Sequence, residues 1–202
     1  MRALKGHGTG NDFIIVPAAD RDFTADEVAL LCDRHFGIGA DGLIRIVPTA
    51  SAEDPFVRGQ AADAEWFMDY RNADGSLAEM CGNGVRVFVH ALIAEGRMQP
   101  GAFAVATRGG VRHVSIDVVG GDVAVDMGVG EPLLPSSITI GEGETFPAAG
   151  MLFPNPHAVV FVDSLDDAGH LLDGARVDGG ETHPLTGRPH HAAMNHARQL
   201  HV

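Results

Sequence analysis

Residues 72–86 read NADGSLAEMCGNGVR, and this stretch says more about the fold than any other. It places Cys81 directly before Gly-Asn-Gly and before apolar residues at helical spacing, among them Val85, Phe88 and Leu92. This pattern predicts a helix that begins just after the cysteine. The unpaired N–H groups and the positive dipole end of such a helix favour a thiolate. We therefore predict that Cys81 is a chemically active thiol with a low pKa.

The residues that follow the cysteine are suited to an anion. Gly82 and Gly84 have no side chain, so a bound anion can come close to the backbone amides. Asn83 adds an amide donor and acceptor at the same place. The segment therefore predicts an anion-binding helix start beside a thiol.

The composition is that of an enzyme rather than a nucleic-acid or membrane protein. The chain has 202 residues, of which 45% are hydrophobic, enough for one large domain or two small ones. Its net charge of −13 argues against nucleic-acid and anionic membrane partners, and no apolar run reaches membrane-spanning length. The first residues lack the apolar core of a signal peptide. Two cysteines do not suggest a disulfide framework, so we expect a cytoplasmic enzyme acting on a small molecule.

The second cysteine has a different setting. Thr24 and Glu27 form a capping-box pattern, and Val28, Leu31 and Cys32 then share one face of the predicted helix. A cysteine on such an apolar stripe is typical of core packing, so we assign Cys32 no chemistry.

The order of predicted elements indicates an α+β fold. Hydrophobic patterns predict strands at 13–16, 43–47, 65–70 and 158–162, helices at 24–34 and from 82 to about 95, and a three-stranded meander at 103–107, 111–119 and 122–127. Residues 132–154 read as a loop with one short strand at 137–140. Strands joined by hairpins do not form a regular βαβ series. We place a domain boundary near residue 118, giving domains 1–118 and 119–202.

Two motifs suggest ligands that their context does not support. Residues 37–42, GIGADG, match the dinucleotide pattern G-x-G-x-x-G but follow a predicted helix and precede a strand, the reverse of what that motif requires. The late histidines lack ligand spacing and accompanying carboxylates (His170, His183, His190, His191, His196 and His201). We therefore predict no nucleotide, no metal and no other cofactor.

Four segments together resemble the diaminopimelate epimerase family. They are residues 5–13 (KGHGTGNDF), 32–42 (CDRHFGIGADG), 70–84 (YRNADGSLAEMCGNG) and 155–159 (NPHAV). They occur in the family's order and spacing, and the match extends to about residue 172. The resemblance implies an α+β fold of two pseudo-symmetric domains, each a mixed sheet wrapped around a central helix.

The resemblance also implies an activity and a site. Family members interconvert LL- and meso-diaminopimelate without a cofactor, in the route to lysine and peptidoglycan. A homodimer is the candidate assembly. One cysteine takes the α-proton as a thiolate and a second, on the opposite face of the substrate, returns a proton. Cys81 matches the first cysteine, and His157 matches a histidine beside the pair. The substrate contacts carry over to Asn11, Asn72, Gly82, Asn83 and Asn155.

The sequence departs from the family at three places. Gly42 stands where many members have a glutamine that contacts substrate, and Pro154 precedes Asn155 where glycine is usual. From about residue 173 the family's later motifs, including a second Cys-Gly-Thr-Gly, are not found. We therefore expect an incomplete second domain, as in a truncated or frame-shifted member, and little epimerase activity from this chain alone.

Other functions remain open at this point. The missing second cysteine favours a fragment that binds substrate without inverting it. A thiol enzyme could use Cys81 and His157 as nucleophile and base for acyl transfer, but no orienting acid is recognisable. A binding module of the same fold without catalysis is the last alternative.

Overall fold

The computed structural model describes residues 2–17, 21–140, 144–153, 155–161 and 176–178. The chain divides into two compact units, Met1–Met127 and Gly128–Val202. The division lies after Met127 rather than near residue 118, because strand β7 (Val123–Val125) pairs antiparallel with β6 (Arg112–Ile116) and so belongs to the first unit.

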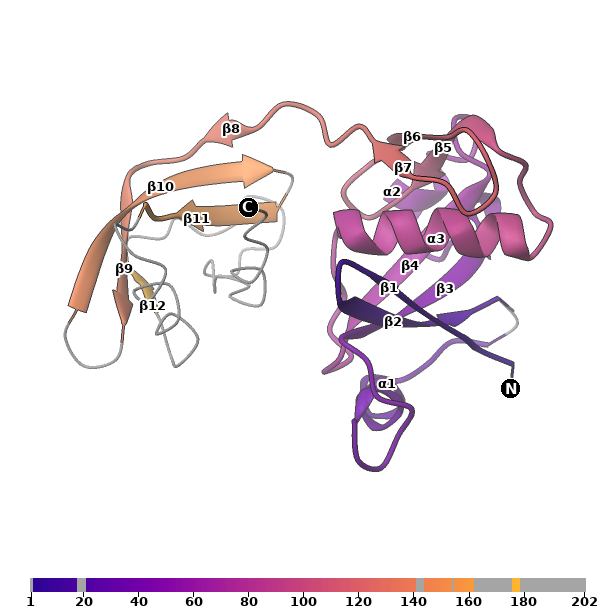
Figure 1. Cartoon of the computed structure of the whole chain (residues 1–202), viewed down its shortest axis with the longest axis horizontal. Coiled ribbons are helices and arrows are strands. Elements are labelled where there is room, and N and C mark those ends of the chain that lie inside the picture. The colour runs from indigo at the N-terminus through magenta and orange to yellow at the C-terminus, as the bar shows by residue number, and fades with distance from the viewer. Residues whose placement is uncertain (1, 18–20, 141–143, 154, 162–175, 179–202) are drawn as a thin grey trace. The chain divides into compact units, whose positions relative to one another are not determined.

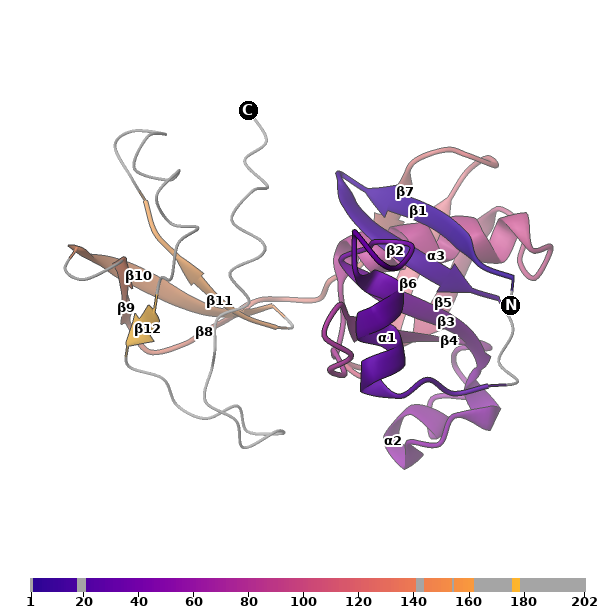
Figure 2. The ribbon, with the colours of Figure 1, turned by 90° about the horizontal axis from the view of Figure 1, so that it is seen from below.

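The first unit is built on a seven-stranded mixed sheet (Figures 1 and 2). Its strands are neighbours in sequence order, with parallel pairs at β2–β3 and β4–β5 and antiparallel pairs elsewhere. They are β1 (Leu4–Gly8), β2 (Asn11–Val16), β3 (Gly42–Pro48), β4 (Trp66–Asn72), β5 (Gly101–Ala106), β6 and β7. The helices are α1 (Ala25–Cys32), α2 (Pro55–Arg58) and α3 (Gly82–Ala94), with a 3₁₀ turn at Thr49–Ser51.

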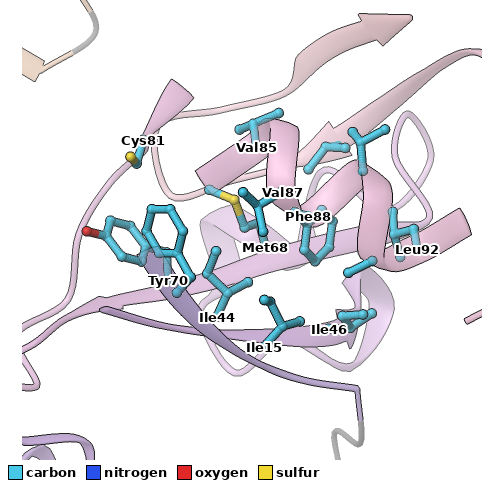
Figure 3. Packing of buried hydrophobic residues seen from close by; sticks show 14 of the residues in the cluster. Ile15, Ile44, Ile46, Met68, Tyr70, Cys81, Val85, Val87, Phe88 and Leu92 are labelled. Carbon is cyan, nitrogen blue, oxygen red and sulfur yellow. The ribbon is translucent and has the colours of Figure 1, made fainter. Parts of the chain in front are cut away.

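Helix α3 is the centre of the main hydrophobic core. It packs against β1 and β7, the two edge strands, and against β2, β3 and β4 between them, so the sheet curls around the helix. Alternate strand residues such as Phe13, Ile44 and Met68 meet Val85 and Phe88 of the helix, and all five are buried. Figure 3 shows this cluster running along α3. The predicted central helix is thus confirmed for this unit.

The other face of the sheet carries a separate apolar cluster under α1. Ile14 and Leu43, which alternate with the α3-facing residues, pack there against Val28 and Cys32. Cys32 is 4% exposed, so its predicted core role is confirmed. The capping box at Thr24 is also present, with Glu27 returning a hydrogen bond to the Thr24 backbone.

The elements of this unit lie close to the predicted ranges, except for three that were not predicted: strand β1, the one-turn helix α2 in a predicted loop, and the 3₁₀ turn at Thr49–Ser51. The meander at β5, β6 and β7 and the end of α3 near Glu95 are confirmed. Strand β1 was not predicted, because the sequence LKGHG is poor in strand formers. It is a strand because it pairs along its length with β2, from Leu4 opposite Ile15 to Gly8 opposite Asn11.

The second unit contains a sheet in the order β11-β10-β9-β12, with β8 paired to β10. The strands are β8 (Glu131–Pro132), β9 (Ser136–Ile140), β10 (Glu144–Phe153), β11 (Asn155–Val159) and β12 (Arg176–Asp178). The prediction of a loop at 132–154 was wrong for β10, whose first half, with Pro147, pairs with β9 and whose second half, with Gly150, pairs with β11. Apart from β12, the predicted tail from about residue 173 lies outside the described residues.

Candidate active site at the start of helix α3

Cys81 is the N-cap residue of α3. Its backbone is extended, with φ −144° and ψ 117°, and its carbonyl accepts the N–H of Val85 at 2.8 Å. Its Sγ accepts the N–H of Gly84 at 3.4 Å. The thiol is 5% exposed and lies at the Tyr70 end of the core cluster (Figure 3). The predicted position of the sulfur at a helix N-terminus is therefore confirmed.

The electrostatics of the thiol differ from the prediction. Burial raises the pKa of Cys81 above its ordinary value, although the N–H groups of Gly84 and Asn83 and the charge of Arg86 oppose this. The predicted low pKa is thus wrong, because desolvation of the thiolate outweighs the helix end. Burial raises the pKa of Cys32 as well, to about 11.

Asn11, at the start of β2, lies beside the sulfur. Its side-chain oxygen Oδ1 accepts from Sγ of Cys81 at 3.7 Å and from Nδ2 of Asn83 at 3.5 Å. Its nitrogen Nδ2 donates to Oδ2 of Asp41 at 2.9 Å. Three of the predicted site residues therefore meet at one place, although they come from segments far apart in the sequence.

The hairpin between β1 and β2 closes against the first turn of α3. A Cβ atom added to Gly8 would lie 3.1 Å from the backbone oxygen of Asn83, so any larger residue would have to push the Asn83 backbone slightly aside. The turn residue Thr9 has a positive φ of 52° and donates its hydroxyl to Oδ1 of Asn83 at 3.2 Å. Arg86 donates to the same oxygen. The Asn83 side chain is thereby fixed from two directions.

Gly82 is the first residue of α3 and is partly exposed. A Cβ atom added to it would lie 3.5 Å from Sδ of Met127 and 4.0 Å from Nη1 of Arg86. These are ordinary contact distances, so glycine is not required for packing here. The space beside this first helical turn, with a guanidinium nearby, suits the approach of an anion.

Asn72 is the last residue of β4, a central strand, and lies at the end of the sheet where β3 begins. Its Oδ1 accepts the hydroxyl of Tyr70 at 3.0 Å and its Nδ2 donates to Oγ of Ser76 at 3.0 Å. Its backbone lies opposite Gly42 in the β3–β4 ladder. A Cβ atom on Gly42 would lie 2.6 Å from the Arg71 oxygen and from the Tyr70 ring, so a longer side chain does not fit this backbone.

The sequence interpretation missed a charged group that supports Asn11. Asp12 is paired with Lys5 at 2.9 Å and with Arg34 at 2.8 Å, and Arg34 also contacts Asp41 at 2.8 Å. The Arg34 and Lys5 hydrogen bonds hold the pKa of Asp12 well below its ordinary value, against the opposing effect of burial. The only signal in the sequence was the polar run at residues 10–12 before a buried strand.

Asn155 and His157 belong to the second unit. Asn155 begins β11 opposite Phe153, and partly exposed His157 lies opposite Met151. Pro154 lies outside the described residues. The placement of Asn155 and His157 at the site of Cys81 therefore stays a prediction.

Other ligand motifs have structural explanations. Residues 37–42 connect α1 to β3, so the glycine pattern has the context of a loop between a helix and a strand, as expected. Among the described residues no group of His, Cys, Asp and Glu could hold a metal ion. No helix in the described part of the chain is long and apolar enough to cross a membrane.

A hollow of about 250 Å³ lies on the sheet face opposite α3. Fully buried Asp69 lies beside it and is paired with Arg45 at 2.5 Å and with Arg108. The arginines are therefore satisfied by the protein itself, and this hollow contains none of the predicted site residues.

Comparison with known proteins gives relatives along most of the chain. The diaminopimelate epimerase family model matches residues 3–131. The diaminopimelate epimerase of Streptomyces coelicolor is 50% identical over 204 residues, covering 95% of this chain and 68% of the relative. Those of Thermobifida fusca and Corynebacterium glutamicum are 50% and 48% identical, covering 78% and 80% of this chain. The chain spans 58% of the length of each of these two relatives.

Solved structures share the fold at low sequence identity. A PhzF-family protein of Bacillus anthracis aligns with a TM-score of 0.50 at 17% identity, over 84% of this chain and 59% of that one. A hydroxyproline epimerase from Agrobacterium vitis aligns with a TM-score of 0.53 at 16% identity, over 78% and 50%. The fold is therefore one that the chain shares with a PhzF-family protein and a hydroxyproline epimerase. With the family model matched across the unit that holds Cys81 and with relatives at about 50% identity, the chain belongs to the diaminopimelate epimerase family.

Proposed function

We propose that this chain supplies one of the two thiols of a cofactor-independent epimerase that interconverts LL- and meso-diaminopimelate. The observation that supports this most is the position of Cys81 Sγ, at the N-terminus of α3 and beside Asn11 and Asn83. The other cysteine, Cys32, is buried in a separate cluster under α1 and cannot face the same substrate atom.

Cys81 acts on the α-carbon of the amino acid. As a thiolate it accepts the α-proton, forming an S–H bond while the C–H electron pair stays on carbon as a carbanion. A thiol from outside the 202 residues then gives a proton to the opposite face, and the configuration inverts. Because the α-proton is weakly acidic, a thiolate of raised pKa is the better matched base, and burial of Cys81 supplies that property.

The substrate carboxylate binds at the start of α3. The N–H groups of Gly82 and Asn83 are at the helix N-terminus, where a negative charge is stabilised, and Arg86 adds a positive charge beside them. These donors also stabilise the charge that moves from the α-carbon onto the carboxylate in the carbanion.

The remaining family contacts complete the site. Asn72 is held by hydrogen bonds to Tyr70 and Ser76, so its amide is fixed at the end of β4. Asn155 contacts the substrate from the second unit, and His157 assists the protonation balance of the thiols. We further propose that the enzyme works in the cytoplasm, in the synthesis of lysine and peptidoglycan precursors, without a cofactor and without nucleic-acid or membrane partners.

A second candidate is binding of the substrate without inversion. It is favoured by the single thiol at the described site, since inversion by two bases requires an acid on the opposite face of the substrate. Acyl transfer by Cys81 and His157 is less favoured, because the sequence offers no recognisable acid to orient the histidine.

Inversion of LL-diaminopimelate in deuterated water tests the proposal. The chain is joined to the part of the Streptomyces coelicolor relative that it does not span, and meso product and α-deuterium are measured by chiral chromatography and NMR. We expect inversion with deuterium uptake that is lost in Cys81→Ser and retained in the matched variant Cys32→Ser. Inversion that survives Cys81→Ser would contradict the proposal.

The 202-residue chain alone separates the two candidates. If LL-diaminopimelate slows the alkylation of Cys81 but no meso product and no deuterium uptake are found, the chain is a binding fragment. Robust inversion by the chain alone would show that an acid within these residues faces Cys81.

A further inference from the structure

The Asn11 amide is held between two different kinds of partner. On one side its Nδ2 lies 2.9 Å from Oδ2 of Asp41. On the other side its Oδ1 faces Sγ of Cys81 at 3.7 Å and Nδ2 of Asn83 at 3.5 Å. The two ends of an amide have opposite hydrogen-bonding properties, so its orientation decides what the thiol meets.

The partner on the Asp41 side decides that orientation. An ionised carboxylate only accepts hydrogen bonds, and an amide oxygen has no proton to give it. A flipped Asn11 would therefore place its carbonyl oxygen 2.9 Å from the Asp41 oxygen, with no proton between the two acceptors. It would also turn its own N–H groups toward the sulfur. We propose that Asp41 is a positioning residue, which keeps the carbonyl oxygen of Asn11 directed at Cys81 and so favours the protonated thiol.

Asp41 is itself fixed in place. Its Oδ2 also accepts the backbone N–H of Asp12 at 3.1 Å, and its Oδ1 accepts from Nη2 of Arg34 at 2.8 Å. Its own backbone N–H donates to the Asp12 carbonyl oxygen at 2.9 Å. A carboxylate held by a guanidinium and two backbone contacts keeps one geometry, which is what orienting a neighbouring amide requires.

Other groups around the thiol act in both directions. From α3, the N–H groups of Gly84 and Asn83 and the cation of Arg86 favour the thiolate, and from the β2–β3 side the charge of Asp41 disfavours it. Among the described residues Tyr70, on β4, is a further titratable neighbour, and its pKa is raised by burial and by the Cys81 charge. Asn11 is the neutral group whose effect changes sign with its orientation, because its oxygen favours the thiol and its nitrogen the thiolate.

Asp41→Asn tests the proposal, because it keeps the size of the side chain and removes the acceptor-only carboxylate. The rate of iodoacetamide alkylation of Cys81 is measured in the 202-residue chain between pH 6 and 11, with the two cysteine peptides quantified separately. We expect the midpoint of the pH profile to move down by about 1 pH unit, the size of one hydrogen bond gained or lost at the sulfur. Asp63→Asn, which removes an exposed carboxylate far from these contacts, is the matched control and should leave the profile unchanged.

A double-mutant cycle with Asn11→Ala separates orientation from charge. If Asp41 acts through Asn11, Asp41→Asn moves the midpoint by less than about half as much in the Asn11→Ala background as in the original chain. An equal shift in both backgrounds, or no shift in the original chain, would overturn the proposal. Thermal unfolding checks that each variant is folded, and Asp41→Ser gives the same reading if Asp41→Asn does not fold.

The inference rests on the proposed function for the role of Cys81, but its readout is the thiol alone. A shifted alkylation profile, together with no epimerisation by the protein joined to the Streptomyces coelicolor segment, would retain Asp41 as a positioning residue and refute the proposed reaction. Epimerisation together with an unshifted profile would do the reverse.

Discussion

The side-chain oxygen of Asn11 lies 3.7 Å from Sγ of Cys81, across 70 positions of sequence. The contact exists because β2 begins at the end of the sheet where α3 also begins. The β1–β2 hairpin closes over the first turn of the helix. One side of the thiol therefore faces the helix N-terminus, with its N–H donors, and the other faces a carbonyl acceptor. This balance fits the role proposed for Cys81, a thiol that both takes and returns a proton.

The first prediction contrasts two glycines beside Asn83. In Gly82→Ala the added methyl group meets Met127 at ordinary contact distance, so the unfolding midpoint should change little. The same methyl group occupies the approach to the first helical N–H groups. Diaminopimelate should therefore no longer protect Cys81 from alkylation. Gly8→Ala should instead lower the stability by about 1–3 kcal/mol, because its methyl group would lie 3.1–3.3 Å from Asn83 atoms and would push the first turn of α3 away from the hairpin. Thermal unfolding and alkylation rates of both variants measure this, and equal destabilisation by the two would contradict it.

The second prediction concerns the turn between β1 and β2. Thr9 and Gly10 have φ values of 52° and 85°, the positive values required at both central positions of a type I′ turn. A β-branched residue is strained there, whereas Asn followed by Gly is favoured. Thr9→Asn should therefore raise the free energy of unfolding by about 0.5–1 kcal/mol. Urea denaturation measures it, and a loss of stability would show that the Thr9 hydroxyl bond to Asn83 outweighs the strain.

The third prediction follows from the buried thiol of Cys32. Its pKa is about 11 in the folded chain and near 9.0 in the unfolded chain, so the folded chain holds the thiol proton more tightly. Its contribution to stability is complete below pH 9 and is lost as the pH rises toward 11. Cys32→Ala should remove this part of the pH dependence, on the order of 1–2 kcal/mol, while lowering stability at neutral pH through the smaller side chain. Urea midpoints at pH 8 and pH 10.5 for both proteins measure it. Parallel curves for the two proteins would refute it.

The fourth prediction concerns acid stability. Pairing with Arg34 holds the pKa of Asp12 below its unfolded value near 3.8. The stabilisation is present above that pH and is lost as the pH falls below it. Arg34→Leu should therefore be less stable by about 1 kcal/mol at pH 6, a modest value because the arginine is half exposed, and the difference should narrow toward pH 2. A difference that stays constant from pH 6 to pH 2 would show that Arg34 acts by packing alone.

The sequence by itself determined the elements whose causes are local. The helix after Cys81 follows from apolar spacing and a cap, the Thr24 capping box from residues three apart, and the meander from glycine turns between β-branched runs. The core role of Cys32 followed from its place on the stripe of α1. Four short motifs in order were enough for the family.

Only the tertiary structure decided features that depend on distant partners. Strand β1 exists through its pairing with β2, and β10 through strands on both sides, since neither has a clear local pattern. The contact of Asp41 with Asn11 and of Asn11 with Cys81 joins three segments of the chain. The pKa of Cys81 depended on this as well. The helix end that favours a thiolate is visible in the sequence, but the desolvation that outweighs it arises from the strands that cover the sulfur.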